Sequence, residues 1–180
     1  MKRSLFLTIA AIALVAAPRV SHAQLGVLKP FQLGIAGGGS LPMSDLSTSN
    51  STGYNGTVAM AINLPLIPVG IRVDGAYNAF GAKATGGAKY HVMSATGNLV
   101  WGLPMVGISP YLIGGAGLYM STVQPTGAAN VTSNNFGFNA GAGVKLPVSV
   151  FNAFVEARYN RIKANGGSLS FVPVTVGIMF

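Results

Sequence analysis

The sequence contains no cysteine and very few charged residues, and each absence excludes a class of protein. Without cysteine among its 180 residues, the chain has neither a disulfide framework nor a zinc site built on thiolates. Only 8% of the residues are charged, against about 25% in soluble domains. Three acidic residues are too few for most metal sites and for most active sites that use two carboxylates. Because half of the residues are apolar, a disordered chain is excluded as well.

Long apolar runs are also missing. A helical membrane protein of this composition would contain runs of about 18 or more apolar residues. After residue 23, with glycine and proline not counted as apolar, no run exceeds five residues, which are found at 58–62. Transmembrane helices are therefore not expected after this point.

The first 23 residues have the three parts of a secretory signal peptide. Lys2 and Arg3 form a positive start, residues 5–17 are almost entirely apolar, and small residues occupy the last and third-last positions before the expected cut. We predict cleavage after Ala23, which leaves residues 24–180 as the mature domain. An N-terminal membrane anchor is the alternative, although the apolar segment is short for a membrane span.

The mature chain would be only modestly basic. Eight basic residues would remain against Asp45, Asp74 and Glu156, a net charge of +5. There is no run of lysine and arginine and no basic stripe interleaved with aromatic residues, so a nucleic-acid partner is not expected. The sequence also suggests no metal and no cofactor.

Apolar residues recur at every second position in several segments, most clearly in 54–64, 136–146 and 172–180. The intervening positions are mostly small or polar. Since side chains on a strand alternate between two faces, each segment has one apolar face and one small or polar face. A transmembrane barrel turns the apolar face toward lipid and fills its interior with the other. The many glycine, alanine, asparagine, serine and threonine residues suit a narrow lumen better than the core of a sandwich.

The connections between these segments alternate in length. Three short proline-containing connections lie at 64–68, 103–107 and 146–149, and four longer or more polar ones lie at 40–53, 81–89, 121–135 and 162–168. Short turns at one end and long loops at the other are typical of outer-membrane barrels. We therefore predict an all-β fold, an eight-stranded antiparallel up-and-down transmembrane β-barrel. The expected strands are 30–39, 54–64, 69–80, 89–101, 107–120, 135–146, 150–161 and 169–180.

The inward and outward faces of two of these strands need separate treatment. In 89–101, Ser94, Thr96 and Asn98 are expected to point inward, which sends Trp101 outward. In 107–120, glycine and alanine fill positions 114–117, and the pattern does not assign inward and outward faces.

The segment SPYLIGGAGLY at 109–119 and the alternating Val174, Val176, Ile178 and Phe180 at the end resemble the eight-stranded outer-membrane β-barrel domain family. That family groups with the OmpA transmembrane domain and OmpX, and the resemblance covers about residues 24–180. It implies a Gram-negative outer membrane, contact with its lipid and lipopolysaccharide, and recognition of these four alternating residues by the barrel assembly machinery. It implies no single activity. Because nothing follows Phe180, a peptidoglycan-binding domain of the OmpA kind is not expected. We also expect a monomer.

Five charged residues are expected inside the barrel. Arg72 and Asp74 alternate with apolar neighbours on one strand, Glu156 and Arg158 do so on a roughly opposite strand, and Lys145 is expected to join them. One interpretation is a gate or a proton path. We favour the other, a structural plug, because a charge in a lumen this narrow must be paired to offset its desolvation.

Lys83, Lys89, Arg161 and Lys163 fall at the long-loop ends of the predicted strands. They would form an outer rim, where lipopolysaccharide phosphates lie and could pair with cations. Ordinary solubilising charge is the alternative interpretation.

His91 would be the only histidine of the mature chain. Strand alternation places Ser94 on the opposite face, and no acidic residue is near in sequence, so a lipid A deacylase or other hydrolase has little support. The leading hypothesis is a small closed barrel, not an enzyme, with a structural or surface-interaction role carried by its long loops. The alternatives are a narrow channel or small-amphiphile-binding barrel and, more remotely, a soluble secreted sandwich or calycin.

Overall fold

The computed structural model describes residues 31–64, 67–84, 87–103, 105, 108–148, 151–164 and 167–180. The predicted signal peptide and its cleavage site lie outside these ranges. Among the described residues, no helix is both long enough and apolar enough to cross a membrane.

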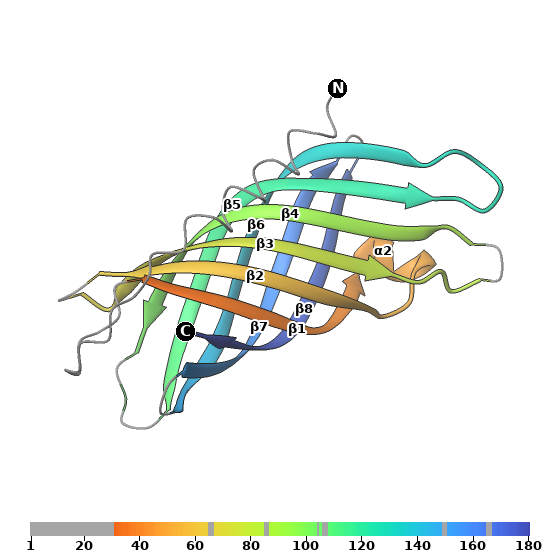
Figure 1. Cartoon of the computed structure of the whole chain (residues 1–180). Helices are drawn as coiled ribbons and strands as arrows, with labels where there is room; N and C mark the ends of the chain where they lie inside the picture. Colours follow the sequence, from red (N-terminus) through yellow and green to blue (C-terminus); the bar gives the residue numbers. More distant parts are fainter. Residues whose placement is uncertain are drawn as a thin grey trace.

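The described chain forms a closed antiparallel barrel in which each strand pairs with its neighbours in sequence (Figure 1). The last strand pairs with the first, from Gly34 opposite Met179 to Met43 opposite Ser170. The predicted fold is therefore confirmed. The strands are β1 (Phe31–Met43), β2 (Gly53–Asn63), β3 (Val69–Phe80), β4 (Lys89–Gly102), β5 (Ser109–Gln124), β6 (Val131–Val148), β7 (Phe151–Ala164) and β8 (Gly167–Met179).

The two-residue period of the sequence becomes an outer and an inner surface. On β2, Val58 is 62% exposed on the outside, whereas its neighbour Ala59 is 7% exposed in the lumen. The strand β5, whose inward and outward faces the sequence pattern did not assign, also has two clear faces. Tyr111, Ile113 and Tyr119 of β5 are buried inside, and Leu112 and Leu118 lie outside. The run of glycine and alanine hid this alternation because residues without large side chains carry no polarity signal.

Several predicted loops are shorter than expected, because the strands continue into them. The predicted loop 121–135 is mostly a hairpin, in which β5 runs to Gln124 and β6 begins at Val131. The predicted loop 40–53 contains the end of β1 and a short helix, α2 (Ser44–Ser49). Polar Ser, Thr and Asn residues marked these segments as loops, but the structure extends the strands through them, with Ser40 and Ser121 buried and residues 131–134 exposed.

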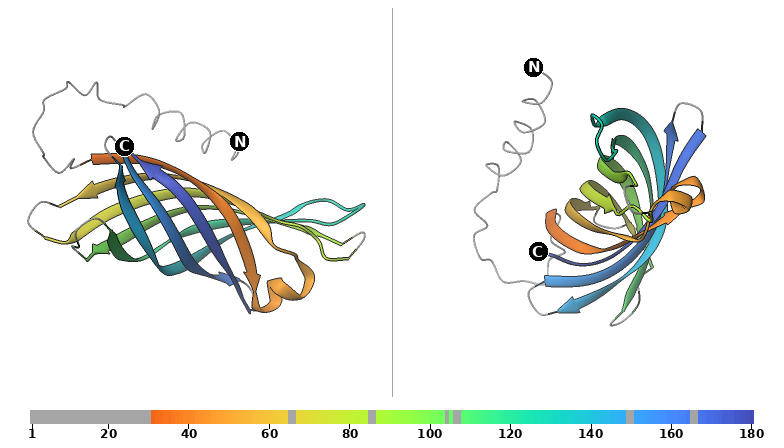
Figure 2. Two further views of the ribbon diagram at one scale, coloured as in Figure 1. Left: turned by 90° about the horizontal axis from the view of Figure 1, so that it is seen from below. Right: turned by 90° about the vertical axis from the view of Figure 1, so that its right-hand side faces the viewer.

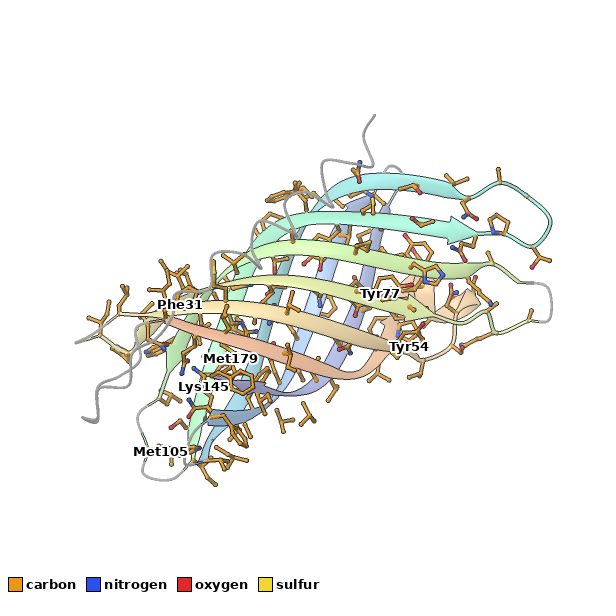
Figure 3. The ribbon with its side chains drawn as sticks, in the orientation of Figure 1. Phe31, Tyr54, Tyr77, Met105, Lys145 and Met179 are labelled. Atoms are coloured by element: carbon orange, nitrogen blue, oxygen red, sulfur yellow. The ribbon has the colours of Figure 1, made fainter. Side chains whose placement is uncertain are left out.

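The two ends of the barrel differ. We call the end with the β2–β3, β4–β5 and β6–β7 connections the turn end, and the opposite end the loop end. Figure 2 shows the β5–β6 hairpin projecting at the loop end of the barrel. At the turn end, Phe180 closes the barrel, since its N–H donates to the carbonyl of Leu33 at 2.8 Å. Phe31 and Met105 lie toward the turn end and Tyr54 and Tyr77 toward the loop end (Figure 3).

The β1–β2 connection, which we call the first loop, contains α2 and folds over the loop end. It is hydrogen-bonded to the β3–β4 connection. The side chain of Asn50 donates to the carbonyls of Gly81 and Ala88, each at 3.1 Å. The Lys83 N–H donates to the carbonyl of Ser49, and its ammonium group donates to the carbonyl of Ser47. These bonds tie the α2 segment to the β3–β4 connection, and α2 also contacts β8 and β1 at the mouth of the barrel.

Candidate functional site

Four charged side chains meet across the middle of the lumen, and we call them the ion-pair layer: Arg72 and Asp74 from β3, and Glu156 and Arg158 from β7. Arg72 Nη2 donates to both carboxylate oxygens of Glu156, at 2.8 and 2.7 Å. Arg158 Nη1 donates to Asp74 Oδ2 at 2.8 Å. These two contacts join strands on opposite sides of the barrel, so the pairs bridge the interior.

Each residue of the ion-pair layer also contacts the partner on its own strand. Arg72 Nε lies 3.0 Å from Asp74 Oδ1, and Arg158 donates to Glu156 Oε1. The side chains of Arg72, Asp74 and Glu156 are at most 5% exposed. Two guanidinium groups thus balance two carboxylates, and this balance is needed because burying an unpaired charge costs several kcal/mol.

Polar neighbours outside the predicted charge cluster complete the layer. Tyr111 donates its hydroxyl to Glu156 Oε2 at 2.8 Å, and Asn98 donates to Asp74 Oδ2 at 2.9 Å. Asn98 was expected to face inward, but its partner could not be read from the pattern. Tyr111 was missed because the faces of its strand were unassigned.

Lys145 stands apart from the ion pairs. Among the described residues it forms no ion pair, and its ammonium group instead lies 5.3 Å from the centre of the Tyr111 ring. It is half-buried near Met179 at the turn end (Figure 3), and the two line a cavity of about 10 Å³. The structure therefore brings four of the five predicted interior charges together and leaves the fifth beside them.

Inward-facing glycines on β6 create the space for two buried tyrosines on β5. A Cβ atom at Gly143 would overlap the Tyr111 ring, and one at Gly137 would lie 2.8 Å from Tyr119 Cε2. The rings therefore lie over these glycines, a device by which aromatic residues cover glycines in sheets. This explains why glycine is needed inside the barrel even though the lumen also holds large side chains.

Apolar side chains lie on both sides of the ion-pair layer. At the loop end, a buried cluster that we call the outer apolar layer spans the lumen and includes a residue of α2; its members are Leu46, Phe80, Val92, Tyr119, Ile162 and Phe171. Toward the turn end, Phe154 and Met179 pack with Ala59 and Ala61, and Tyr111 packs with Val100 and Ile113. A cavity of about 30 Å³ remains beside the ion-pair layer, lined by Asp74, Asn78, Glu156, Arg158 and Asn160 among others.

The four predicted rim cations lie at the loop end but in different surroundings. Lys83 is tied to Ser47, as described above. Lys89 is exposed at the start of β4. Arg161 and Lys163 are exposed on the outer surface of β7, and the Lys163 ammonium group lies 5.6 Å from the centre of the Phe138 ring.

His91 lies on the outer surface of β4. Its Nδ1 is 2.8 Å from the Tyr77 hydroxyl, and its Nε2 is 3.1 Å from Gln124 Oε1. Neither partner is a serine nucleophile or a carboxylate. Within the described ranges, no three histidine or acidic side chains gather into a metal site.

The alternating residues at the end of β8 face outward. Val174, Val176 and Phe180 are 40%, 62% and 51% exposed on the outer surface, while Met179 between them is buried in the lumen. The apolar stripe therefore lies where lipid would contact it.

Comparison with known proteins shows the family to which this chain belongs. The family model described as outer membrane protein beta-barrel domain matches residues 4–180. This match begins within the predicted signal peptide. No curated protein matches the sequence.

Solved structures of outer-membrane proteins share the fold. The Neisserial surface protein NspA superposes with a TM-score of 0.69 at 15% identity, over 84% of this chain and 96% of that one. Ail, the attachment invasion locus protein of Yersinia pestis, gives 0.54 at 18% identity, over 83% and 97%. The outer membrane enzyme PagL gives 0.54 at 16% identity, over 83% and 98%. At these identities the likeness concerns the fold alone, and it includes an enzyme as well as surface proteins.

The family match over nearly the whole chain, the closed eight-stranded barrel and the apolar outer surface agree with one another. The protein is a member of the outer membrane protein β-barrel domain family and an integral protein of the outer membrane.

Proposed function

We propose that the protein is a closed, non-enzymatic barrel whose function is carried by its loop end, as a structural or surface-binding element of the cell envelope. The observation that carries this proposal is the ion-pair layer. Its contacts bridge β3 and β7 across the lumen, and the outer apolar layer covers it on the loop side. An ion passing through would have to separate buried ion pairs and enter an apolar layer, and both steps are costly.

Solute flux through vesicles tests the closed lumen against the narrow-channel alternative. Purified protein is refolded into liposomes, and swelling is followed in an isotonic solution of a small amino acid, with a general porin as positive control. We expect wild-type vesicles to behave like empty ones. The Arg72→Ala/Glu156→Ala variant, which removes one bridging pair together with both of its charges, should admit solute if the layer closes the lumen. Swelling by the wild type would refute the closed lumen.

The β5–β6 hairpin supports a surface-binding role. On one side, β6 pairs with β5 as far as Val131. On its other side, pairing with β7 begins only at Gly137, so the edge of residues 131–136 that faces away from β5 has no strand partner among the described residues. A free strand edge can accept an extended segment of another protein. Residues 131–134 are exposed, and the hairpin projects beyond the barrel wall (Figure 1).

Shortening the hairpin tests this role. Deleting 121–123 together with 131–133 removes three cross-strand pairs in register. Cells that display the wild type should attach to immobilised host-matrix or serum proteins more than cells that display the shortened chain, at equal surface level. Equal attachment would contradict a role of the hairpin. The expectation is also consistent with the name of Ail, the attachment invasion locus protein of Yersinia pestis.

The final strand supports a proposal about assembly. We infer that Val174, Val176, Ile178 and Phe180 are the stripe read by the barrel assembly machinery, since their outward positions end at the closing contact with β1. Phe180→Ala should slow the appearance of heat-modifiable barrel in growing cells, whereas Met179→Leu, which changes only a lumen residue, should not. Equal rates for both variants would count against this inference.

A further inference from the structure

We propose that Arg161 and Lys163 form a binding site for the phosphate group of a membrane glycolipid, on the outer surface of the barrel at the β6–β7 seam. This goes beyond the proposed surface-binding role, because it concerns the lipid-facing wall and not the hairpin edge.

Both cations lie where the apolar wall of β7 ends. Going from the turn end to the loop end, the outward residues of β7 are Val155, Ala157 and Tyr159, followed by Arg161 and Lys163. On β8 the outward residues change in the same way, from Val174 and Val172 to serines at 170 and 168. The two strands are in register here, with Arg161 opposite Ser170 and Lys163 opposite Ser168. The pair is thus at the boundary between hydrocarbon and headgroups, on the outward-facing side of the sheet.

Neither cation has an anionic partner among the residues that the structure describes. The carboxylate side chains of the described residues are Asp45 in α2 and the two inside the lumen, and Arg161 and Lys163 form no ion pair with any of them. Cations on the lipid-facing side of a barrel are destabilising unless they are compensated, and less so near the interface than at the midplane. An anion supplied by the membrane would compensate them.

The geometry suits a phosphate group. Outward residues two positions apart on a strand are separated by about 7 Å, so both side chains can reach one phosphate group. A guanidinium donates two parallel hydrogen bonds to phosphate, and an ammonium adds a point charge. Within the described part of the chain, no carboxylate forms an ion pair with either donor.

Aromatic residues next to the pair favour a lipid over a soluble ion. Phe138 lies opposite Arg161, and its ring packs edge-on against Phe136 with centroids 5.0 Å apart. Both rings are about half exposed on the outer surface. They offer an apolar surface directly beside the cations, as an amphiphile with a phosphorylated headgroup and acyl chains requires.

The other loop-end cations do not share this arrangement. Lys83 donates to a carbonyl of the first loop, and Lys89 lies on β4, on a different part of the wall. Together they provide a matched control, because replacing both removes the same charge from the same end of the barrel.

Retention of lipid A in detergent tests the site. The full chain, refolded in mixed micelles, is offered bis-phosphorylated lipid A or the same lipid A without phosphates, and retained lipid is counted by native mass spectrometry. We expect the wild type to prefer the phosphorylated form by tenfold or more. Arg161→Gln/Lys163→Gln should lose this preference, a tenfold change being about 1.4 kcal/mol. Lys83→Gln/Lys89→Gln should keep it, as should the charge-conserving Arg161→Lys/Lys163→Arg.

The outcomes separate the alternatives, with heat-modifiable mobility used to confirm that each variant is folded. Equal losses in the two glutamine double variants would mean general attraction by a basic rim and would overturn the site. No loss in Arg161→Gln/Lys163→Gln would also overturn it. Displacement of lipid A by millimolar inorganic phosphate would assign the pair to a soluble phosphate instead of a glycolipid.

Discussion

The strongest stability prediction concerns the pairing of Arg72 with Glu156. Glu156 accepts two hydrogen bonds from Arg72, at 2.8 and 2.7 Å, one from the Tyr111 hydroxyl at 2.8 Å, and others from Arg158. The layer is neutral as a whole, with two guanidiniums and two carboxylates. Glu156→Gln leaves it with a charge of +1, and Arg72→Met leaves it with −1. Either change leaves a buried charge without a partner. Breaking a buried ion pair in this way costs about 3–5 kcal/mol.

The double variant Arg72→Met/Glu156→Gln behaves differently, because the remaining Asp74 and Arg158 still balance each other. We expect it to be no less stable than the worse single variant, so that the interaction energy between the two sites is about 3 kcal/mol or more. Residues that do not interact would give additive losses.

The assay is urea unfolding in lipid vesicles, followed by fluorescence. The chain has one tryptophan, Trp101, which is 50% exposed on the outer surface and would report departure from the lipid. Lys89→Gln, at an exposed position of the loop end, is the control and should change the free energy of unfolding by less than about 0.5 kcal/mol. Additive losses in the double variant would refute the idea that these charges act as one neutral layer.

Three further predictions use the same unfolding assay. Tyr111→Phe leaves Glu156 one donor short and should cost about 1–3 kcal/mol; no loss would show that this hydroxyl contributes nothing to the layer. Gly117→Ala should destabilise the barrel by about 1–3 kcal/mol, since the added Cβ would overlap the Ala95 carbonyl, whereas Gly97→Ala, with nothing within 4 Å of its Cβ, should be near neutral; equal effects would contradict the close packing of β4 and β5. Val73→Arg, at a residue 47% exposed on the outer wall, should cost about 2–4 kcal/mol in a bilayer, and a neutral result would place this surface away from hydrocarbon.

The barrel could be predicted because its sequence signals are local. Alternation fixes which face of each strand is apolar, and the contrast between short turns and polar loops fixes the number of strands. The inward direction of Arg72, Asp74, Glu156 and Arg158 follows from the same period. Their partners depend on the tilt and stagger of the strands, and the period contains no information about either.

What could not be predicted depends on contacts between distant segments. Leu46 lies in a segment expected to be a loop, and its burial requires α2 to fold back over the mouth. Tyr111 donates to Glu156 because Gly143 makes room for its ring. The sequence places Lys83 in the rim, yet its ammonium group donates a hydrogen bond to the Ser47 carbonyl in another loop. In each case a second segment, far away in sequence, decides what the residue does.

Electrical recording from single barrels tests the central claim, a lumen closed by the ion-pair layer and the outer apolar layer. Wild-type protein is inserted into a planar bilayer in 1 M salt, and insertion is verified by recovering heat-modifiable barrel from the same membranes. The closed lumen predicts a current equal to that of the bare bilayer over the whole voltage range. Steady, stepwise conducting levels in the wild type would contradict it.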